Sequence, residues 1–164
     1  VGKPLPGMQV RIDKPDADGV GEIHLTGPMV MTGYIDKEPI DGDLNTDDIG
    51  YVDEDGFVYI LNRRKDLIIS GGENIYPKEL EDLVYTLPSV KECAVVPVPD
   101  PKWGQVPALF VAFHDGESMT ADEIVSFMTK SLAKYKVPKY VKILPALPRN
   151  GTGKIVRNEL RLED

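Results

Sequence analysis

Residues 62–77 decide the fold of this chain, and they read Asn62-Arg-Arg-Lys-Asp-Leu-Ile-Ile-Ser-Gly-Gly-Glu-Asn-Ile-Tyr-Pro77. The stretch joins three consecutive cations to a short apolar run and a pair of glycines. The composition also changes where it begins. Residues 1–62 carry 4 Lys and Arg against 13 Asp and Glu, whereas residues 63–164 carry 15 against 14. We therefore expect a structural boundary near residue 62.

The region before this stretch is predicted to be rich in β-strands. Gly and Pro recur every few positions between short alternating segments, which is typical of an antiparallel sheet or barrel. Asp55 and Gly56 fit the turn of a hairpin over residues 51–59, because such a turn needs residues that tolerate a positive φ. The expected strands cover residues 8–12, 22–25 and 58–61.

The region after the stretch is predicted to alternate helices with strands. Apolar residues spaced i, i+3, i+4, i+7 from Leu80 predict a helix over about residues 77–87. Thr120 and Glu123 form a capping box, which predicts a second helix over about residues 121–133. The remaining predicted elements are paired strands at residues 91–98 and 105–113, a strand at 140–144 and a short terminal helix at 156–162.

Length and composition bound the class of protein. A chain of 164 residues with 41% hydrophobic residues can bury a core. Its longest apolar run, residues 108–113, is far shorter than the roughly 18 residues of a membrane-spanning helix. Position 1 is Val and no signal segment follows it, so we expect the sequence to begin inside a longer protein.

The single cysteine, Cys93, cannot form an intrachain disulfide, and this favours a reducing compartment, the cytoplasm. Its apolar neighbours predict a buried structural thiol rather than a nucleophile. The sequence contains only two histidines, and no cluster has the spacing of metal ligands. No metal site is therefore expected.

Three polar segments are candidates for chemistry. The cations at residues 63–65 fit a solvated strand end, and Gly71 with Gly72 fits either a simple turn or a backbone that approaches a ligand closely. Asp48, at the end of Asn45-Thr-Asp-Asp48, fits either an acceptor for a ribose diol or a residue that closes a turn.

The third segment is residues 148–154, Pro-Arg-Asn-Gly-Thr-Gly-Lys, which lacks the Gly and the Ser or Thr that a Walker motif requires. Its glycines and Lys154 fit either a mobile loop that delivers an ammonium group to developing negative charge or a flexible surface loop. Residues 129–164 hold 9 basic and 3 acidic side chains, which favours an anionic ligand. No nucleic-acid motif accompanies them.

Taken in order, these segments resemble those of the adenylate-forming enzymes, which include acyl-CoA synthetases, firefly luciferase and the adenylation domains of peptide synthetases. The matching segments are residues 23–33, 45–50, 63–77 and 147–160, so the resemblance covers nearly the whole chain. Residues 63–77 are most similar to the acyl-CoA synthetase branch and, within it, to bacterial 2-succinylbenzoate:CoA ligases.

The resemblance implies an ATP-dependent carboxylic acid:CoA ligase that works in two steps. The acid attacks the α-phosphate of ATP to form an acyl-adenylate, and the CoA thiol then displaces AMP. The implied substrates are ATP with Mg²⁺, CoA and the acid, without a bound prosthetic group, and the closest similarity implies 2-succinylbenzoyl-CoA in menaquinone biosynthesis. Two alternatives stay open: an adenylating enzyme that loads a carrier protein, and a non-catalytic binding module.

The resemblance also implies a domain organisation of the α+β class. Residues 1–62 correspond to the barrel-like, antiparallel end of a large N-terminal domain, residues 63–66 to a hinge, and residues 67–164 to a small mobile C-terminal domain with helices packed on a short mixed sheet. The ATP phosphate loop and the acyl pocket belong to the missing N-terminal domain. This part of the enzyme is therefore expected to be inactive alone.

The site residues implied by the resemblance stand at matching positions. Lys154 matches the catalytic lysine that bridges the carboxylate and the α-phosphate. Asp48 matches the residue that binds the ribose hydroxyls of ATP or AMP, Arg63 the one that contacts the ribose and phosphate, and Lys65 the hinge. The implied CoA-binding residues are Gly71, Gly72, Trp103, Tyr135 and Lys139.

Three positions depart from the family pattern. Asp47 and Asn62 stand where the family usually has Gly, which affects the expected loop geometry more than the ligand chemistry. Val137 stands where some relatives have a basic residue, next to the segment expected to contact CoA. Ordinary packing is also left open for Trp103, because an aromatic side chain serves either purpose.

Overall fold

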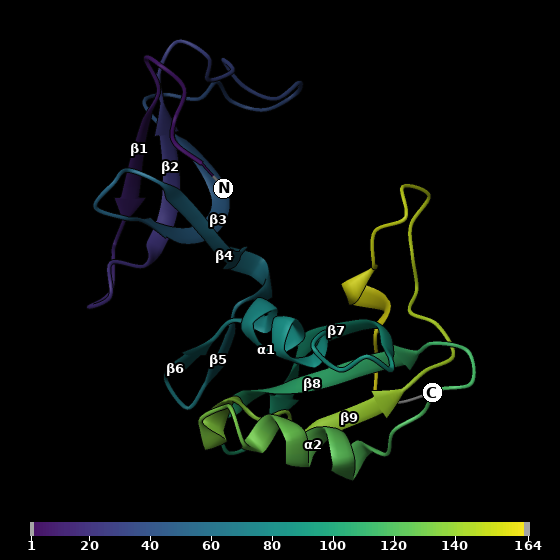
Figure 1. Cartoon of the computed structure of the whole chain (residues 1–164). Helices are drawn as coiled ribbons and strands as arrows, with labels where there is room; N and C mark the ends of the chain where they lie inside the picture. The colour runs from purple at the N-terminus through teal and green to yellow at the C-terminus, as the bar shows by residue number, and fades with distance from the viewer. Residues whose placement is uncertain (1, 163–164) are drawn as a thin grey trace. The chain divides into compact units, whose positions relative to one another are not determined.

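The computed structural model describes residues 2–162 (Figure 1). The chain divides into two compact units, Val1–Lys65 and Asp66–Asp164, which are called the first and second unit below. Val1 and residues 163–164, at the outer ends of the two predicted domains, lie outside the described residues.

The first unit is a four-stranded antiparallel sheet with the order β1-β2-β3-β4. Its strands are β1 Gln9–Asp13, β2 Gly21–Thr26, β3 Leu44–Val52 and β4 Val58–Arg63. The antiparallel sheet was expected, but it does not close into a barrel. Closure requires the two edge strands to pair, and in the described sheet β1 and β4 are both edges.

The predicted hairpin is confirmed at the β3–β4 turn. Asp53 Oδ1 accepts hydrogen bonds from the amides of Asp55 at 3.0 Å and Phe57 at 2.8 Å, and Gly56 adopts a φ of 81°. Tyr51 and Tyr59 face each other across the two strands with stacked rings, 4.8 Å between centroids. The turn and this aromatic pair together hold the register of the hairpin.

The second unit contains two α-helices and a five-stranded mixed sheet. Strand β8 pairs antiparallel with β5 and β7 and parallel with β9, while β6 pairs with β5. Its elements are β5 Ile68–Ser70, β6 Glu73–Ile75, α1 Pro77–Val84, β7 Val90–Asp100, β8 Gly104–Phe113, α2 Ala121–Thr129 and β9 Tyr140–Ile143, with 3₁₀ turns at Lys134–Lys136 and Arg157–Glu159. Another 3₁₀ turn, Arg64–Asp66, includes the point in the chain where the two units divide. The α+β class and the mixed sheet are thus confirmed.

The central strands β7 and β8 are buried on both faces, which explains why their sequences are continuously apolar rather than alternating. One face packs with the helices, in a cluster containing Leu80, Val95, Leu109, Ile124 and Met128. The opposite face packs with the C-terminal segment, in a cluster containing Ala94, Ala108, Phe110, Leu147 and Leu160. The β7–β8 pair therefore contributes side chains to two hydrophobic cores.

Two predicted helix ends are wrong, and the predicted terminal helix is not an α-helix. The first helix ends at Val84 instead of residue 87. Leu87 precedes Pro88, and the helical conformation is unfavourable for a residue that precedes proline. The second ends at Thr129. The terminal helix is only a 3₁₀ turn, because the chain extends at Leu160, which is buried in the second core. The capping box at the start of α2 is confirmed.

Candidate functional site

Asp48 and Arg63, the residues expected to bind ATP or AMP, are register partners on β3 and β4. Nε of Arg63 lies 2.9 Å from Oδ1 of Asp48, and NH1 of Arg63 donates to the carbonyl of Thr46 at 2.9 Å. Asp48 is mostly buried whereas Arg63 is exposed, with side-chain exposures of 16% and 55%. The ion pair through Oδ1 fixes the guanidinium of Arg63 beside the carboxylate of Asp48.

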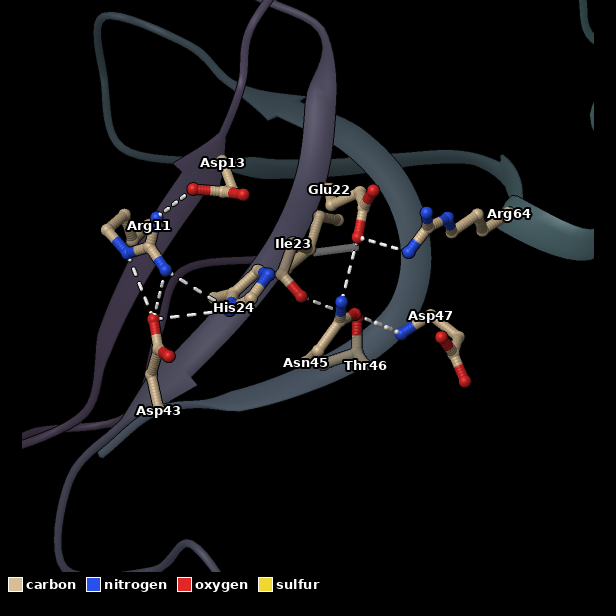
Figure 2. Close-up of polar contacts among 10 residues, drawn as sticks. All are labelled: Arg11, Asp13, Glu22, Ile23, His24, Asp43, Asn45, Thr46, Asp47 and Arg64. Atoms are coloured by element: carbon tan, nitrogen blue, oxygen red, sulfur yellow. Dashed lines mark hydrogen bonds and ion pairs between the residues drawn. The ribbon is translucent and has the colours of Figure 1, made fainter. Parts of the chain in front are cut away.

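An irregularity in the β2–β3 register just before Asp48 explains how a side chain stands at position 47, where a glycine was expected. Asp47 adopts a φ of 58°, the left-handed conformation that Asp tolerates better than most residues. Its amide donates to Oδ1 of Asn45 at 2.8 Å, and Figure 2 shows the Asp47 carboxylate directed away from that contact. At the other departure, Asn62, Nδ2 is buried and has no hydrogen-bond partner among the described residues.

A second ion pair holds the last turn of the first unit. Oε2 of Glu22 accepts hydrogen bonds from NH1 of Arg64 at 3.1 Å and Nδ2 of Asn45 at 2.8 Å (Figure 2). The two units divide directly after Lys65, the expected hinge residue. An open hollow of about 480 Å³ is lined by Asp47, Arg63, Arg64 and Lys65. Its three cations suit a polyphosphate.

The glycine pair lies in the tight turn between β5 and β6. Gly71 and Gly72 have φ values of 60° and 92°, and the amide of Gly71 donates to the carbonyl of Trp103 at 2.9 Å. A Cβ atom on Gly71 would lie 2.6 Å from Cε3 of Trp103, whereas one on Gly72 would meet nothing within 4 Å. The structure therefore brings Gly71 and Trp103 together and leaves open space beside Gly72.

Asp100 organises the segment that carries Trp103. Its Oδ1 accepts hydrogen bonds from the amides of Lys102 and Trp103, both at 2.9 Å, and its Oδ2 accepts one from Nζ of Lys139 at 2.5 Å. The Lys139 ammonium, together with these two amides, lowers the pKa of Asp100. Sequence reasoning missed this buried carboxylate, which joins two of the expected CoA-binding residues.

The exposed surface here is aromatic and cationic. Nζ of Lys102 lies 4.6 Å from the centroid of the Trp103 ring, and 46% of Trp103 is exposed. Tyr135 lies apart in the 3₁₀ turn Lys134–Lys136, where Nζ of Lys136 is 5.9 Å from its ring. Within residues 2–162, no hydrogen bond or ring contact joins Tyr135 to Trp103 or Lys139.

Lys154 lies on a hydrogen-bonded hairpin that projects from the second unit, drawn in yellow in Figure 1. The hairpin is closed by hydrogen bonds from Asn150 N to Lys154 O at 2.9 Å and from Val156 N to Pro148 O at 2.8 Å. Oδ1 of Asn150 accepts from the amide of Lys154 at 2.9 Å. In the described part of the chain, Nζ of Lys154 has no hydrogen bond or ion pair, so its charge is available to a ligand.

Two buried glutamates anchor both ends of this hairpin, and sequence reasoning did not single them out. Glu92 in β7 pairs with Arg149, and Glu81 in α1 pairs with Arg157 through contacts of 2.6 and 2.9 Å. Arg157 also donates to the carbonyl of Val95 at 2.9 Å. For Glu92 the available signal was a charge at the start of the apolar run 93–96, since such a charge is buried only when it is paired. For Glu81 the signal was its place on the helix face of Pro77 and Val84, which are buried with it.

Cys93 is 2% exposed, which confirms the predicted buried thiol. Among the described residues, no group of His, Cys, Asp or Glu is placed to hold a metal ion. Residues 2–162 also include no helix with the length and apolar character needed to cross a membrane.

This chain was compared with known protein families, curated proteins and solved structures. Residues 79–154 match the model of the AMP-binding enzyme C-terminal domain. The 2-succinylbenzoate--CoA ligase of Lactococcus lactis subsp. lactis is 54% identical over 161 residues, which cover 98% of this chain and 35% of that protein. The chain thus spans about a third of the length of this curated relative.

Solved structures of related synthetases are similar to this chain over nearly its whole length. The o-succinylbenzoate CoA synthetase (MenE) of Bacillus subtilis in complex with the acyl-adenylate intermediate OSB-AMP is similar with a TM-score of 0.88 and 40% identity, over 99% of this chain and 35% of that one. The same synthetase in complex with ATP and magnesium ion has a TM-score of 0.87 and 40% identity, over 97% and 35%. The resemblance found in the sequence is confirmed, and the chain contains the C-terminal domain of the AMP-binding enzymes.

Proposed function

We propose that this chain is part of an ATP-dependent carboxylic acid:CoA ligase whose acid is 2-succinylbenzoate. The 54% identity to a 2-succinylbenzoate--CoA ligase supports the substrate. The full-length protein is proposed to act in the cytoplasm, in menaquinone biosynthesis. In this assignment residues 1–62 end the large domain, residues 63–66 form the hinge and residues 67–164 form the mobile C-terminal domain.

One observation carries the catalytic proposal: the ammonium of Lys154, which has no partner among residues 2–162, stands on a projecting, hydrogen-bonded hairpin. In the first step an acid oxygen attacks the α-phosphorus of Mg-ATP, the new P–O bond forms, and pyrophosphate leaves. Negative charge on the phosphoryl oxygens needs a fixed cation at that moment. Lys154 supplies it by bridging the carboxylate and the α-phosphate.

The remaining site residues take the roles implied by the family. Asp48 accepts hydrogen bonds from the ribose diol, and Arg63, oriented by Asp48, contacts the ribose and phosphate. Lys65 is the hinge residue, because a polar residue tolerates changes of φ and ψ in solvent.

In the second step the sulfur of CoA attacks the acyl carbonyl, the thioester bond forms, and AMP leaves. Gly71 and Gly72 border the pantetheine arm, where the open space beside Gly72 supports a close approach of ligand to backbone. Trp103 stacks on the adenine of CoA, and Tyr135 and Lys139 complete the proposed contacts. The Asp100–Lys139 pair supports a fixed position for that ammonium.

The test uses the full-length protein that contains this chain, assayed for AMP formation with 2-succinylbenzoate and CoA. Lys154→Ala is expected to slow adenylate formation by roughly 100-fold or more, the loss typical of a transition-state donor. Lys130→Ala, which removes an exposed lysine at the end of α2, is the matched control. Normal adenylate formation by Lys154→Ala would overturn the catalytic assignment, and transfer to a holo carrier protein instead of CoA would overturn the acceptor.

A further inference from the structure

The guanidinium of Arg149 bridges a buried carboxylate and the backbone next to Lys154. Nε of Arg149 donates to Oε2 of Glu92 at 3.0 Å, and NH2 also contacts that oxygen. NH1 donates to the carbonyl of Gly153 at 2.5 Å. One side chain thus links strand β7 to the hairpin.

The anchor of this bridge is rigid. Glu92 is 5% exposed within β7, and its Oε1 accepts a hydrogen bond from the amide of Leu147 at 2.8 Å. Burial alone raises the pKa of a carboxyl group, but the hydrogen bonds from Leu147 and Arg149 outweigh it and the pKa of Glu92 is lowered. The Glu92–Arg149 pair is therefore ionised at neutral pH.

The far end of the bridge holds the peptide group that joins Gly153 to Lys154. Arg149 binds the carbonyl of that group, and Oδ1 of Asn150 accepts a hydrogen bond from its N–H at 2.9 Å. Gly153 has a φ of 80°, so its own backbone would not otherwise favour one orientation. Holding both sides of the group fixes the direction in which the Lys154 side chain leaves the hairpin.

We infer that Arg149 is a positioning residue for Lys154, which transmits the fixed position of Glu92 to the peptide group beside the catalytic ammonium. This inference rests on the proposed function. Because Lys154 acts in adenylate formation, the bridge serves that step and is dispensable when CoA attacks a preformed adenylate. Glu92 takes part as the anchor and reaches the reaction only through Arg149.

Arg149→Lys separates positioning from folding. A lysine keeps a cation beside the buried Glu92, but its single ammonium lacks the planar fork that also reaches the Gly153 carbonyl. Arg161→Lys is the matched control, because Arg161 lies in the same C-terminal segment and donates to the carbonyl of Leu160. In the full-length protein, the first step is measured as ATP–pyrophosphate exchange and the second as thioester formation from supplied adenylate.

Arg149→Lys is expected to lower kcat of ATP–pyrophosphate exchange by about 10–100-fold. Displacing a catalytic group such as the Lys154 ammonium by about 1 Å lowers the rate by up to about that factor. KM for ATP and the rate from supplied adenylate should change less than about twofold, as should both steps in Arg161→Lys. In a Lys154→Ala background, Arg149→Lys should add no further loss, because residues that act as a unit are not additive.

Hydrogen exchange of backbone amides in the 164-residue chain tests the Arg149 bridge without an activity assay. Arg149→Lys should speed exchange of the Gly153 and Lys154 amides, and Arg161→Lys should not. Equal loss in both steps, an additive effect with Lys154→Ala, or full exchange activity of Arg149→Lys would overturn the positioning role. Failure of the proposed function is distinguished because the wild-type full-length protein would then form no adenylate.

Discussion

Arg63 and Asp48 form an ion pair across neighbouring strands, with Nε of Arg63 2.9 Å from Oδ1 of Asp48. The two residues are register partners in the β3–β4 hairpin, so its turn at Asp53–Phe57 sets their separation. The guanidinium is also bound to the carbonyl of Thr46. Its direction is therefore set before any ligand arrives.

We expect Arg63→Lys to raise KM for ATP by about tenfold in the full-length protein. A lysine keeps the charge but cannot contact both Asp48 and Thr46 with a planar fork, and a hydrogen bond to a charged group contributes about 1.5–3 kcal/mol. Steady-state kinetics measure the effect. Arg11→Lys, which affects a separate cluster with Asp13 and Asp43 (Figure 2), serves as control, and equal effects of the two variants would contradict the assigned role.

The two glycines of the β5–β6 turn should respond differently to alanine. Both have positive φ, which costs an alanine about 1–2 kcal/mol. Only Gly71→Ala also places a Cβ against Trp103, so it should destabilise the second unit more than Gly72→Ala. Urea unfolding followed by the fluorescence of the single tryptophan measures both. An unchanged native emission spectrum in Gly71→Ala would show that the predicted contact is wrong.

Cys93 should resist thiol reagents in the folded chain. Burial raises its pKa to about 12, with a further contribution from the charge of Glu81, so almost no thiolate exists at pH 8. Labelling with a chromogenic disulfide should be at least about a hundredfold slower in buffer than in urea, because the reactive species forms only on opening. Labelling of the native chain at the rate of the unfolded one would refute this.

Acid should weaken the second unit through Asp100. Its folded pKa is lowered, chiefly by Lys139, so its carboxylate adds stability above the unfolded value of about 3.8. That contribution is lost as the pH falls through the lowered folded value. Asp100→Asn should therefore be less stable than the wild type at pH 7, with a difference that shrinks toward pH 3.

Urea unfolding at pH 7, 5 and 3, followed by Trp103 fluorescence, measures this difference. Asp115→Asn, on the exposed connection between β8 and α2, provides the control and should leave the pH dependence unchanged. A difference between wild type and Asp100→Asn that is constant from pH 7 to pH 3 would contradict the role of the Asp100 carboxylate.

The sequence predicted helix starts and tight turns correctly where the residues that form them are close together in the chain. The capping box of Thr120 and Glu123 starts α2, and Asp55 and Gly56 lie in the β3–β4 turn, because these residues bond to their own near neighbours. The terminal segment shows the opposite case. Its expected helix fails because burial of Leu160 against the sheet outweighs local propensity.

The sequence by itself determined the α+β class, most elements, the family and the position of Lys154 within a glycine-containing segment. Only the tertiary structure decided which charges meet. Glu92 pairs with Arg149, 57 residues away, and Glu81 with Arg157, 76 residues away. Periodicity and turn chemistry report on neighbours along the chain, whereas these pairs depend on which strand and helix the sheet topology places beside the C-terminal segment.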